Sequence, residues 1–142
     1  VVLTNQSAVG RGFFDEAQLD LIHRRLRELL NAEGVQLDGI YFCPHTLEDG
    51  CACRKPNPGL IERAASELDF DLQASFVIGD KPADIEMGRR VKATTFLVRT
   101  GYGAEFVDDL TVNPDYVADD LWAAAQIIHR LVSTSGENKV DP

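Results

Sequence analysis

The stretch SFVIGDKPADIEMGRRVKATTFLV (75–98) decides the fold class, because a strand pattern, a helix pattern and a second strand pattern follow one another in it. Residues 75–79 and 94–98 are short apolar runs rich in β-branched and aromatic side chains, which are typical of strands. Residues 80–91 between them predict a turn that enters a helix. Strands that alternate with helices indicate a parallel sheet covered by helices on both faces.

The same alternation continues outward in both directions. Further strands are predicted at 1–4, 39–42 and 116–118. Asp15, followed by Gln18 as in a capping box, begins a helix whose apolar residues keep helical spacing until Gly34. Residues 57–58 (Asn-Pro) are predicted as the N-cap and first position of a second helix, and Asp119 as the cap of the last. The expected architecture is α/β, with a Rossmann-like parallel sheet.

We expect one domain over residues 1–135 and a flexible tail over 136–142, since the length suits a single core. The first strand pattern begins at Val1 without an initiator methionine, so we expect that sequence preceding it is absent. No apolar run has the length of a bilayer span, and no signal peptide is apparent. Nothing in the sequence demands more than a monomer.

The net charge of −9 argues against general nucleic-acid binding, which needs basic patches. A small phosphorylated substrate stays open, because a pocket can be locally basic on an acidic protein. The odd number of cysteines, three, argues against a disulfide framework and favours a reducing cytoplasm.

All three cysteines lie in CPHTLEDGCACRKP (43–56), together with one histidine. Cys43-x-His45 and Cys51-x-Cys53 are two pairs in which both side chains can project to one face of an extended chain. Three thiolates and one imidazole make a closed tetrahedral zinc site of the structural type. The alternatives are free cysteines beside a surface histidine, or a redox site, which the C-x-C spacing favours less.

Polar residues follow the predicted strands, where parallel sheets place ligands. Thr4 ends the first strand and could hold a phosphate, although a threonine before a turn is also ordinary. Residues 54–55 (Arg-Lys) could neutralise phosphoryl oxygens or form a solvated basic pair. Asp80 could bind Mg²⁺ or cap a helix, with Asp84 one turn further on and Lys81 beside it.

Four segments together resemble successive motifs of the haloacid dehalogenase (HAD) superfamily, in the branch of histidinol-phosphate and heptose-bisphosphate phosphatases. They are LTNQSAVGRG (3–12), CPH…CAC (43–53), CRKPNPG (53–59) and VIGDKPAD (77–84). The resemblance covers roughly residues 1–100. It implies a HAD-like fold with a short zinc-binding loop, and it implies hydrolysis of a phosphoric monoester.

The resemblance also implies roles for individual residues. The implied catalytic residues are Thr4, Lys55 and Asp80. The implied substrate-binding residues are Asn5, Gln6, Ser7, Arg11, Arg54 and Lys81. The implied metal ligands are Cys43, His45, Cys51 and Cys53 for structural zinc, and Asp80 for catalytic magnesium.

The sequence departs from the family in one respect, since the Asp-x-Asp that supplies the nucleophile after a buried strand does not occur. Residues 69–71 (Asp-Phe-Asp) have the spacing but precede a predicted strand, at the wrong end of the sheet. We expect a missing N-terminal strand and helix rather than an evolved pseudoenzyme, and we expect residues 1–142 alone to be inactive.

The activity that the resemblance implies is Mg²⁺-dependent removal of a phosphate from a sugar bisphosphate, through an aspartyl-phosphate intermediate. The expected substrate is a heptose 1,7-bisphosphate, cleaved at the 7-phosphate for bacterial surface-polysaccharide precursors such as those of lipopolysaccharide. The alternatives are histidinol-phosphate hydrolysis and, in a different class, a non-catalytic zinc-stabilised phosphate-binding domain.

Overall fold

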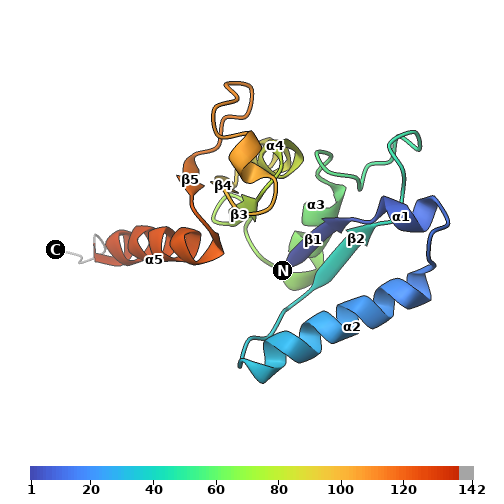
Figure 1. The fold of residues 1–142 in the computed structure, drawn as a ribbon. Coiled ribbons are helices and arrows are strands. Elements are labelled where there is room, and N and C mark those ends of the chain that lie inside the picture. The colour runs from blue at the N-terminus through green and yellow to red at the C-terminus, as the bar shows by residue number, and fades with distance from the viewer. Residues whose placement is uncertain (138–142) are drawn as a thin grey trace. The chain divides into compact units, whose positions relative to one another are not determined.

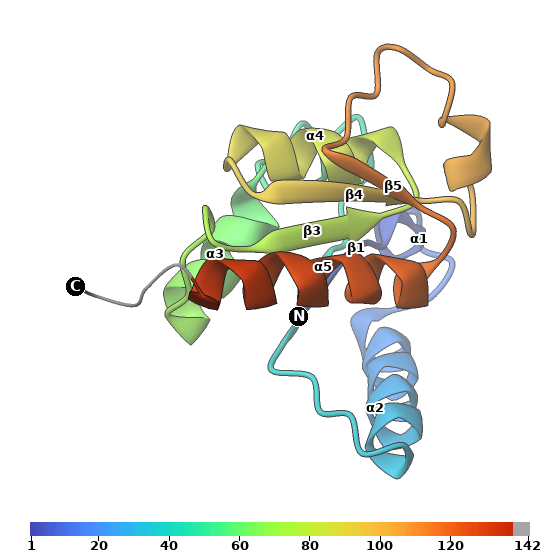
Figure 2. The same ribbon diagram turned by 90° about the vertical axis from the view of Figure 1, so that its left-hand side faces the viewer.

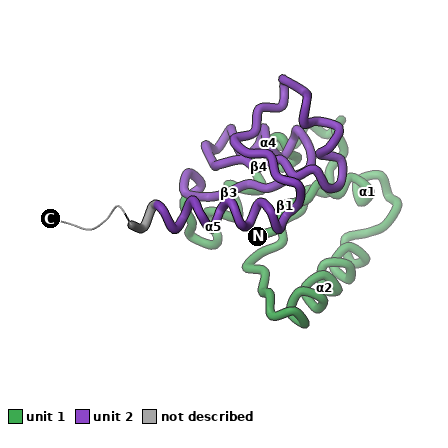
Figure 3. Tube along the Cα trace, turned by 60° about the vertical axis from the view of Figure 1, so that its left-hand side comes forward, with its two compact units in different colours: residues 1–71 green, residues 72–142 purple. Residues whose placement is uncertain are grey.

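A computed structural model describes residues 1–137 of the chain (Figure 1). The chain divides into two compact units, residues 1–71 and 72–142, and each is described here by itself (Figure 3). Of the tail predicted at 136–142, residues 136 and 137 continue the last helix, and 138–142 lie outside the described residues. Within residues 1–137, no helix has both the length and the apolar character that crossing a membrane requires.

Unit 1 is built on two parallel strands. Strand β1 (Val2–Asn5) pairs with β2 (Ile40–Cys43), in a register that sets Val2 opposite Ile40 and Asn5 opposite Cys43. Three helices belong to this unit: α1 (Ser7–Gly10), α2 (Glu16–Ala32) and α3 (Gly59–Leu68). The carboxyl end of β1 therefore lies beside the start of the loop of residues 44–58, which follows β2 and is called the cysteine loop.

Side-chain alternation along β2 places helices on both faces of this small sheet. Tyr41 and Cys43 are buried on one face, in a cluster with Leu60 and Ala64 of α3. Phe42 points to the other face, where its ring centroid lies 5.7 Å from that of His23 in α2. The expectation of a parallel sheet covered on both faces is thus met within unit 1.

Unit 2 contains a three-stranded parallel sheet in the order β3-β4-β5. The strands are β3 (Phe76–Gly79), β4 (Thr94–Val98) and β5 (Tyr116–Ala118). Helix α4 (Pro82–Arg90) and helix α5 (Leu121–Glu137) lie on opposite faces of this sheet, and a 3-10 turn at Gly103–Glu105 follows β4 (Figure 2). The β-α-β pattern of residues 75–98 is confirmed.

Two predicted helix starts differ from the structure, whereas the third agrees. Asp15 accepts a hydrogen bond from the Gln18 N–H (2.8 Å) in the predicted capping box. The last helix is capped by Asp120, whose Oδ1 accepts from the Ala123 N–H (2.8 Å), whereas Asp119 lies outside the helix and pairs with Arg99. The N-cap of α3 is residue 58 rather than residue 57, because the side chain at 57 bonds back to the cysteine loop.

Buried Thr95 in β4 is tied to Asp115 at the start of β5. The Thr95 N–H and hydroxyl each donate to Asp115 Oδ2 at 2.7 Å, and the Asp115 N–H donates to the Thr95 hydroxyl oxygen at 3.0 Å. The backbone hydrogen bond from Thr95, and then the one from its hydroxyl, hold the pKa of the Asp115 carboxyl below its ordinary value. The ionised carboxylate therefore stabilises the pairing of β4 with β5.

This pair predicts a pH-dependent contribution to stability. Because the pKa of Asp115 is lowered in the folded state, its carboxylate adds to the free energy of unfolding at pH values above the ordinary aspartate pKa of about 3.9. This contribution is lost as pH falls through the folded-state pKa. We expect Asp115→Asn to reduce the free energy of unfolding by about 1 kcal/mol at pH 7, and the difference to shrink as pH falls through the lowered folded-state pKa of Asp115. Urea unfolding at each pH measures it. Asp108→Asn, at an exposed loop position, is the matched control, and a pH-independent difference would contradict the prediction.

Candidate active site

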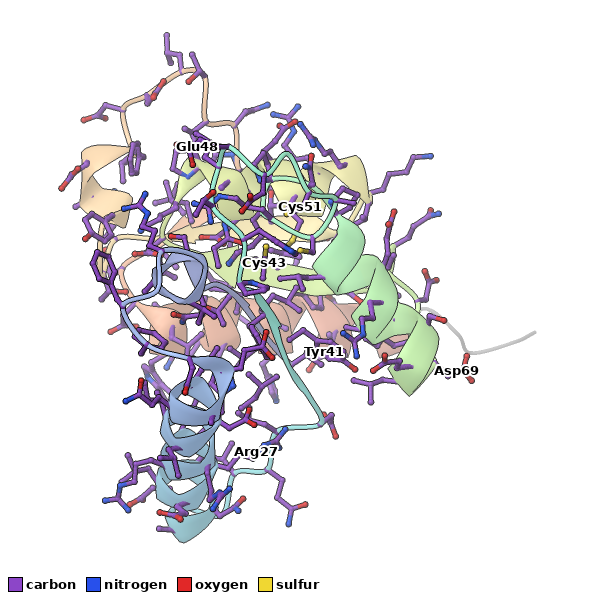
Figure 4. All side chains as sticks on the ribbon, turned by 90° about the vertical axis from the view of Figure 1, so that its right-hand side faces the viewer. Arg27, Tyr41, Cys43, Glu48, Cys51 and Asp69 are labelled. Carbon is purple, nitrogen blue, oxygen red and sulfur yellow. The ribbon has the colours of Figure 1, made fainter. Side chains whose placement is uncertain are left out.

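The four predicted zinc ligands come together in unit 1. Cys43 ends β2, and the loop of residues 44–58 brings the other three back beside it (Figure 4). The Sγ–Sγ distances are 2.9 Å for Cys43–Cys53, 3.4 Å for Cys51–Cys53 and 3.5 Å for Cys43–Cys51. His45 Nδ1 lies 3.5 Å from Cys43 Sγ and 3.2 Å from Cys53 Sγ. All four donor atoms lie within 4.8 Å of one another.

This donor set fits a zinc ion. Zn–S bonds of about 2.3 Å in a tetrahedron separate sulfur atoms by about 3.8 Å. Expansion of the sulfur triangle by less than about 1 Å would therefore admit the ion. Burial raises the pKa of Cys43 to about 12, which opposes ionisation of this thiol. A bound cation would supply the charge that a buried thiolate needs. We propose that this cluster binds a structural zinc ion.

Backbone and amide contacts fix the shape of the cysteine loop. Asn57 Nδ2 donates to the Cys51 carbonyl oxygen (2.8 Å), and the Gly59 N–H donates to the Ala52 carbonyl oxygen (3.1 Å). A side chain at residue 59 would collide with that carbonyl, at 2.6 Å from a Cβ. The loop therefore ends in a tight passage into α3 that glycine makes possible.

Lys55 lies within the loop of residues 44–58, two residues after Cys53, and its side chain reaches β1. Its Nζ donates to the Leu3 carbonyl oxygen at 2.7 Å. Thr4, the next residue of β1, has its hydroxyl oxygen accepting from Gln6 Nε2 at 3.0 Å. An ammonium group and a hydroxyl group are thereby held at the carboxyl end of β1, where a parallel sheet places its ligands.

The remaining predicted residues of unit 1 surround this strand end. Asn5 is the last residue of β1, and its amide bonds to the backbone of Lys55. Ser7 begins α1, and Arg11 is exposed at the end of that helix. Arg54 Nη1 donates to the His45 carbonyl oxygen at 3.1 Å, which ties the guanidinium to the cysteine loop.

Asp80 and Lys81 belong to unit 2, directly after β3. Asp80 Oδ2 accepts from the Tyr102 N–H at 3.0 Å, and the Lys81 ammonium lies 4.2 Å from the centre of the Tyr102 ring. Asp84 is buried and accepts from the Lys81 N–H at 3.1 Å, so it acts as a cap at the start of α4. Asp80 itself precedes the N-cap, which leaves its carboxylate at the strand end.

The structure adds two residues to the surroundings of Asp80 that the sequence had not suggested. Gly101 has φ of +67°, and a Cβ there would collide with the Asp80 carboxylate. Tyr102 supplies the N–H that holds this carboxylate. The available signal was their place in the loop after β4, at the same sheet edge as Asp80.

The Asp-x-Asp at residues 69–71 lies at the opposite end of α3 from Lys55. Asp69 closes α3 with φ of +53°, whereas Lys55 precedes the start of that helix (Figure 4). A ten-residue helix is about 15 Å long. Residues 1–14 and 50–61 contain neither aspartate nor glutamate. The two segments that carry Thr4 and Lys55 therefore contribute only neutral and basic side chains.

The parallel α/β architecture and the strand-end polar groups define the class of protein. A family model described as HAD-hydrolase-like matches residues 52–124. The chain therefore belongs to the HAD-hydrolase-like family of phosphoric monoester hydrolases.

Individual relatives are phosphatases. The chain is 38% identical over 127 residues to D-glycero-β-D-manno-heptose-1,7-bisphosphate 7-phosphatase of Pseudomonas aeruginosa, covering 89% of this chain and 71% of the relative. It is 37% identical over 140 residues to the enzyme of the same name from Pasteurella multocida, covering 94% and 75%. A crystal structure of D,D-heptose 1,7-bisphosphate phosphatase from B. bronchiseptica, complexed with magnesium and phosphate, superposes with a TM-score of 0.85 at 36% identity. That match covers 90% of this chain and 72% of the crystallised one.

Proposed function

We propose that this chain carries the phosphate-binding and metal-binding parts of a Mg²⁺-dependent phosphatase that removes the 7-phosphate of D-glycero-β-D-manno-heptose 1,7-bisphosphate. The observation that carries the proposal is the placement of Lys55. Its backbone lies in the cysteine loop, two residues after Cys53, and its ammonium group reaches β1 beside Thr4. The relatives named above act on this sugar bisphosphate.

In this proposal Lys55 neutralises charge that builds on the phosphoryl oxygens, and the Thr4 hydroxyl donates a hydrogen bond to one of them. Gln6 holds the Thr4 hydroxyl oxygen as an acceptor, so that the hydroxyl proton remains for the phosphate. Arg54, Ser7 and Arg11 contribute to substrate binding around the same strand end.

Asp80 is the proposed magnesium ligand, because a carboxylate oxygen is the hard donor that this ion prefers. The Tyr102 N–H holds one carboxylate oxygen in place. Magnesium, when bound, neutralises phosphate charge. Lys81 is the proposed partner for a further substrate oxygen.

The nucleophile of the proposed reaction is an aspartate outside residues 1–142. The absence of acidic residues at 1–14 and 50–61 and the place of Asp69 at the far end of α3 support this part of the proposal. The aspartate attacks phosphorus, and the P–O bond to the sugar breaks as a general acid protonates the departing sugar oxygen. Water then hydrolyses the aspartyl phosphate, which frees the aspartate and inorganic phosphate.

The test uses the protein expressed from its complete reading frame, beside residues 1–142 alone. We expect the first to release phosphate from the heptose bisphosphate with Mg²⁺, to stop in EDTA, and to turn over histidinol phosphate at least about 100-fold less efficiently. We expect residues 1–142 to be inactive. Equal turnover of both substrates would contradict the substrate assignment, and full activity of residues 1–142 would contradict the external nucleophile.

A further inference from the structure

We infer that Asn5 is a positioning residue, which acts on the phosphate through Lys55 rather than by touching the substrate. This inference rests on the proposed function, in which Lys55 binds the phosphate. It assigns Asn5 a different role from the substrate contact that its place in the motif had suggested.

The carboxamide of Asn5 bonds to both backbone groups of one residue fifty positions away. The Lys55 N–H donates to Asn5 Oδ1 at 3.0 Å, and Asn5 Nδ2 donates to the Lys55 carbonyl oxygen at 3.2 Å. This exchange of both bonds reproduces the pairing of two opposed residues in a β-ladder. Lys55 lies in no strand, so the side chain of Asn5 supplies the partner that a neighbouring strand would have supplied.

The backbone of Asn5 is attached to the other end of the cysteine loop. Asn5 lies opposite Cys43 in the β1–β2 register, and the next N–H, of Gln6, donates to the Cys43 carbonyl oxygen at 2.7 Å. Cys43 is the first predicted zinc ligand, and Cys53, the last, precedes Lys55 by two residues. Asn5 therefore joins the two ends of the segment that the ligands close.

Two constraints consequently act on Lys55. The four-ligand cluster would hold Cys53 close to Cys43, and Asn5 holds the Lys55 backbone to β1. With its backbone fixed, the Lys55 side chain has the reach to place Nζ at the Leu3 carbonyl, 2.7 Å away. Loss of the Asn5 amide would release the lysine backbone while leaving its charge in the protein. With Asn5 in place, zinc binding and phosphate binding are expected to be coupled through Lys55, so that each strengthens the other.

The chemistry of the side chain accounts for asparagine at this position. One donor and one acceptor at the tip of a short side chain match one N–H and one carbonyl. Aspartate would keep the bond to the Lys55 N–H but would face the Lys55 carbonyl with a second acceptor. Leucine has nearly the same shape and can make neither bond.

A double-mutant cycle on inorganic phosphate binding tests the inference. The protein from the complete reading frame, loaded with zinc and Mg²⁺, is titrated with phosphate by calorimetry, and bound zinc is measured for each variant. We expect Asn5→Leu to weaken phosphate binding about tenfold with Lys55 present, and less than about twofold in a Lys55→Met background. Asn31→Leu, the same change at an exposed position of α2, should leave phosphate binding unchanged.

The possible results separate the inference from the proposed function. Failure of the unmutated protein to bind phosphate would overturn the proposed function. Normal phosphate binding by Asn5→Leu, or equal losses with and without Lys55, would overturn the positioning role and indicate direct contact. If Asn5→Leu loses zinc or unfolds, Asn5→Ala replaces it in the same cycle, because alanine also removes both bonds to Lys55 and adds no charge, and the same pattern is expected.

Discussion

Replacing Cys51 by serine is expected to remove zinc from the protein and to lower the thermal stability of unit 1. Structural zinc sites in small peptides contribute about 10–16 kcal/mol, so one of four ligands accounts for roughly 3 kcal/mol, or about 150-fold in affinity. After dialysis against a chelator that leaves zinc on the unmutated protein, the variant is therefore expected to have lost the ion. The loop of residues 44–58 contains no strand or helix, which makes its shape depend on the ligands and on the Asn57 and Gly59 bonds. Metal analysis per chain and a melting curve measure the two effects.

A histidine pair supplies the matched control for this prediction. His45→Asn should also lose zinc, because His45 Nδ1 lies 3.2 Å from Cys53 Sγ. His129→Asn makes the same change at an exposed position of α5 and should keep one zinc per chain. Retention of one zinc per chain by Cys51→Ser, with an unchanged melting temperature, would contradict the zinc assignment.

Replacing Lys55 by methionine is expected to lower kcat of the complete protein by about 100-fold to 1,000-fold. Methionine keeps the length and apolar stem of the side chain but removes the charge. Loss of one preorganised group that stabilises charge in a transition state has effects of this size. Steady-state kinetics on the heptose bisphosphate measure the change in kcat and KM separately.

Two further variants separate the role of Lys55 from a general effect of charge. Lys92→Met removes one positive charge at an exposed position after α4 and should leave kcat within about twofold. Lys55→Arg keeps the charge but not the fit to the Leu3 carbonyl, and it should restore only part of the rate. A Lys55→Met protein that keeps its zinc and its full kcat would show that the lysine does not stabilise the transferring phosphate.

Local patterns in the sequence predicted the features that depend on neighbours in the chain. The β-α-β unit at 75–98 follows from residue types within a single window, and the Asp15 capping box follows from a spacing of three. The clustering of Cys43, Cys51 and Cys53 was likewise predicted from a local pattern, the paired Cys-x-His and Cys-x-Cys spacing of zinc-ligand residue types.

Features that depend on contacts between distant residues were not predictable in this way. The amide of Asn5 bonds to a backbone fifty residues away, a contact that no local pattern in the sequence contains. Tyr102 meets Asp80 only because β3 and β4 are adjacent and parallel. The start of α5 differs by one residue because Asp119 and Asp120 are adjacent residues of the same type, and the structure uses Asp120 as the cap.

The most direct test of the central proposal is a ³¹P NMR record of the heptose 1,7-bisphosphate during incubation with Mg²⁺ and the protein from the complete reading frame. The proposed function predicts that the 7-phosphate signal disappears, the 1-phosphate signal persists, and one equivalent of inorganic phosphate appears. Loss of the 1-phosphate signal instead, or two unchanged signals with zinc-loaded protein, would contradict it.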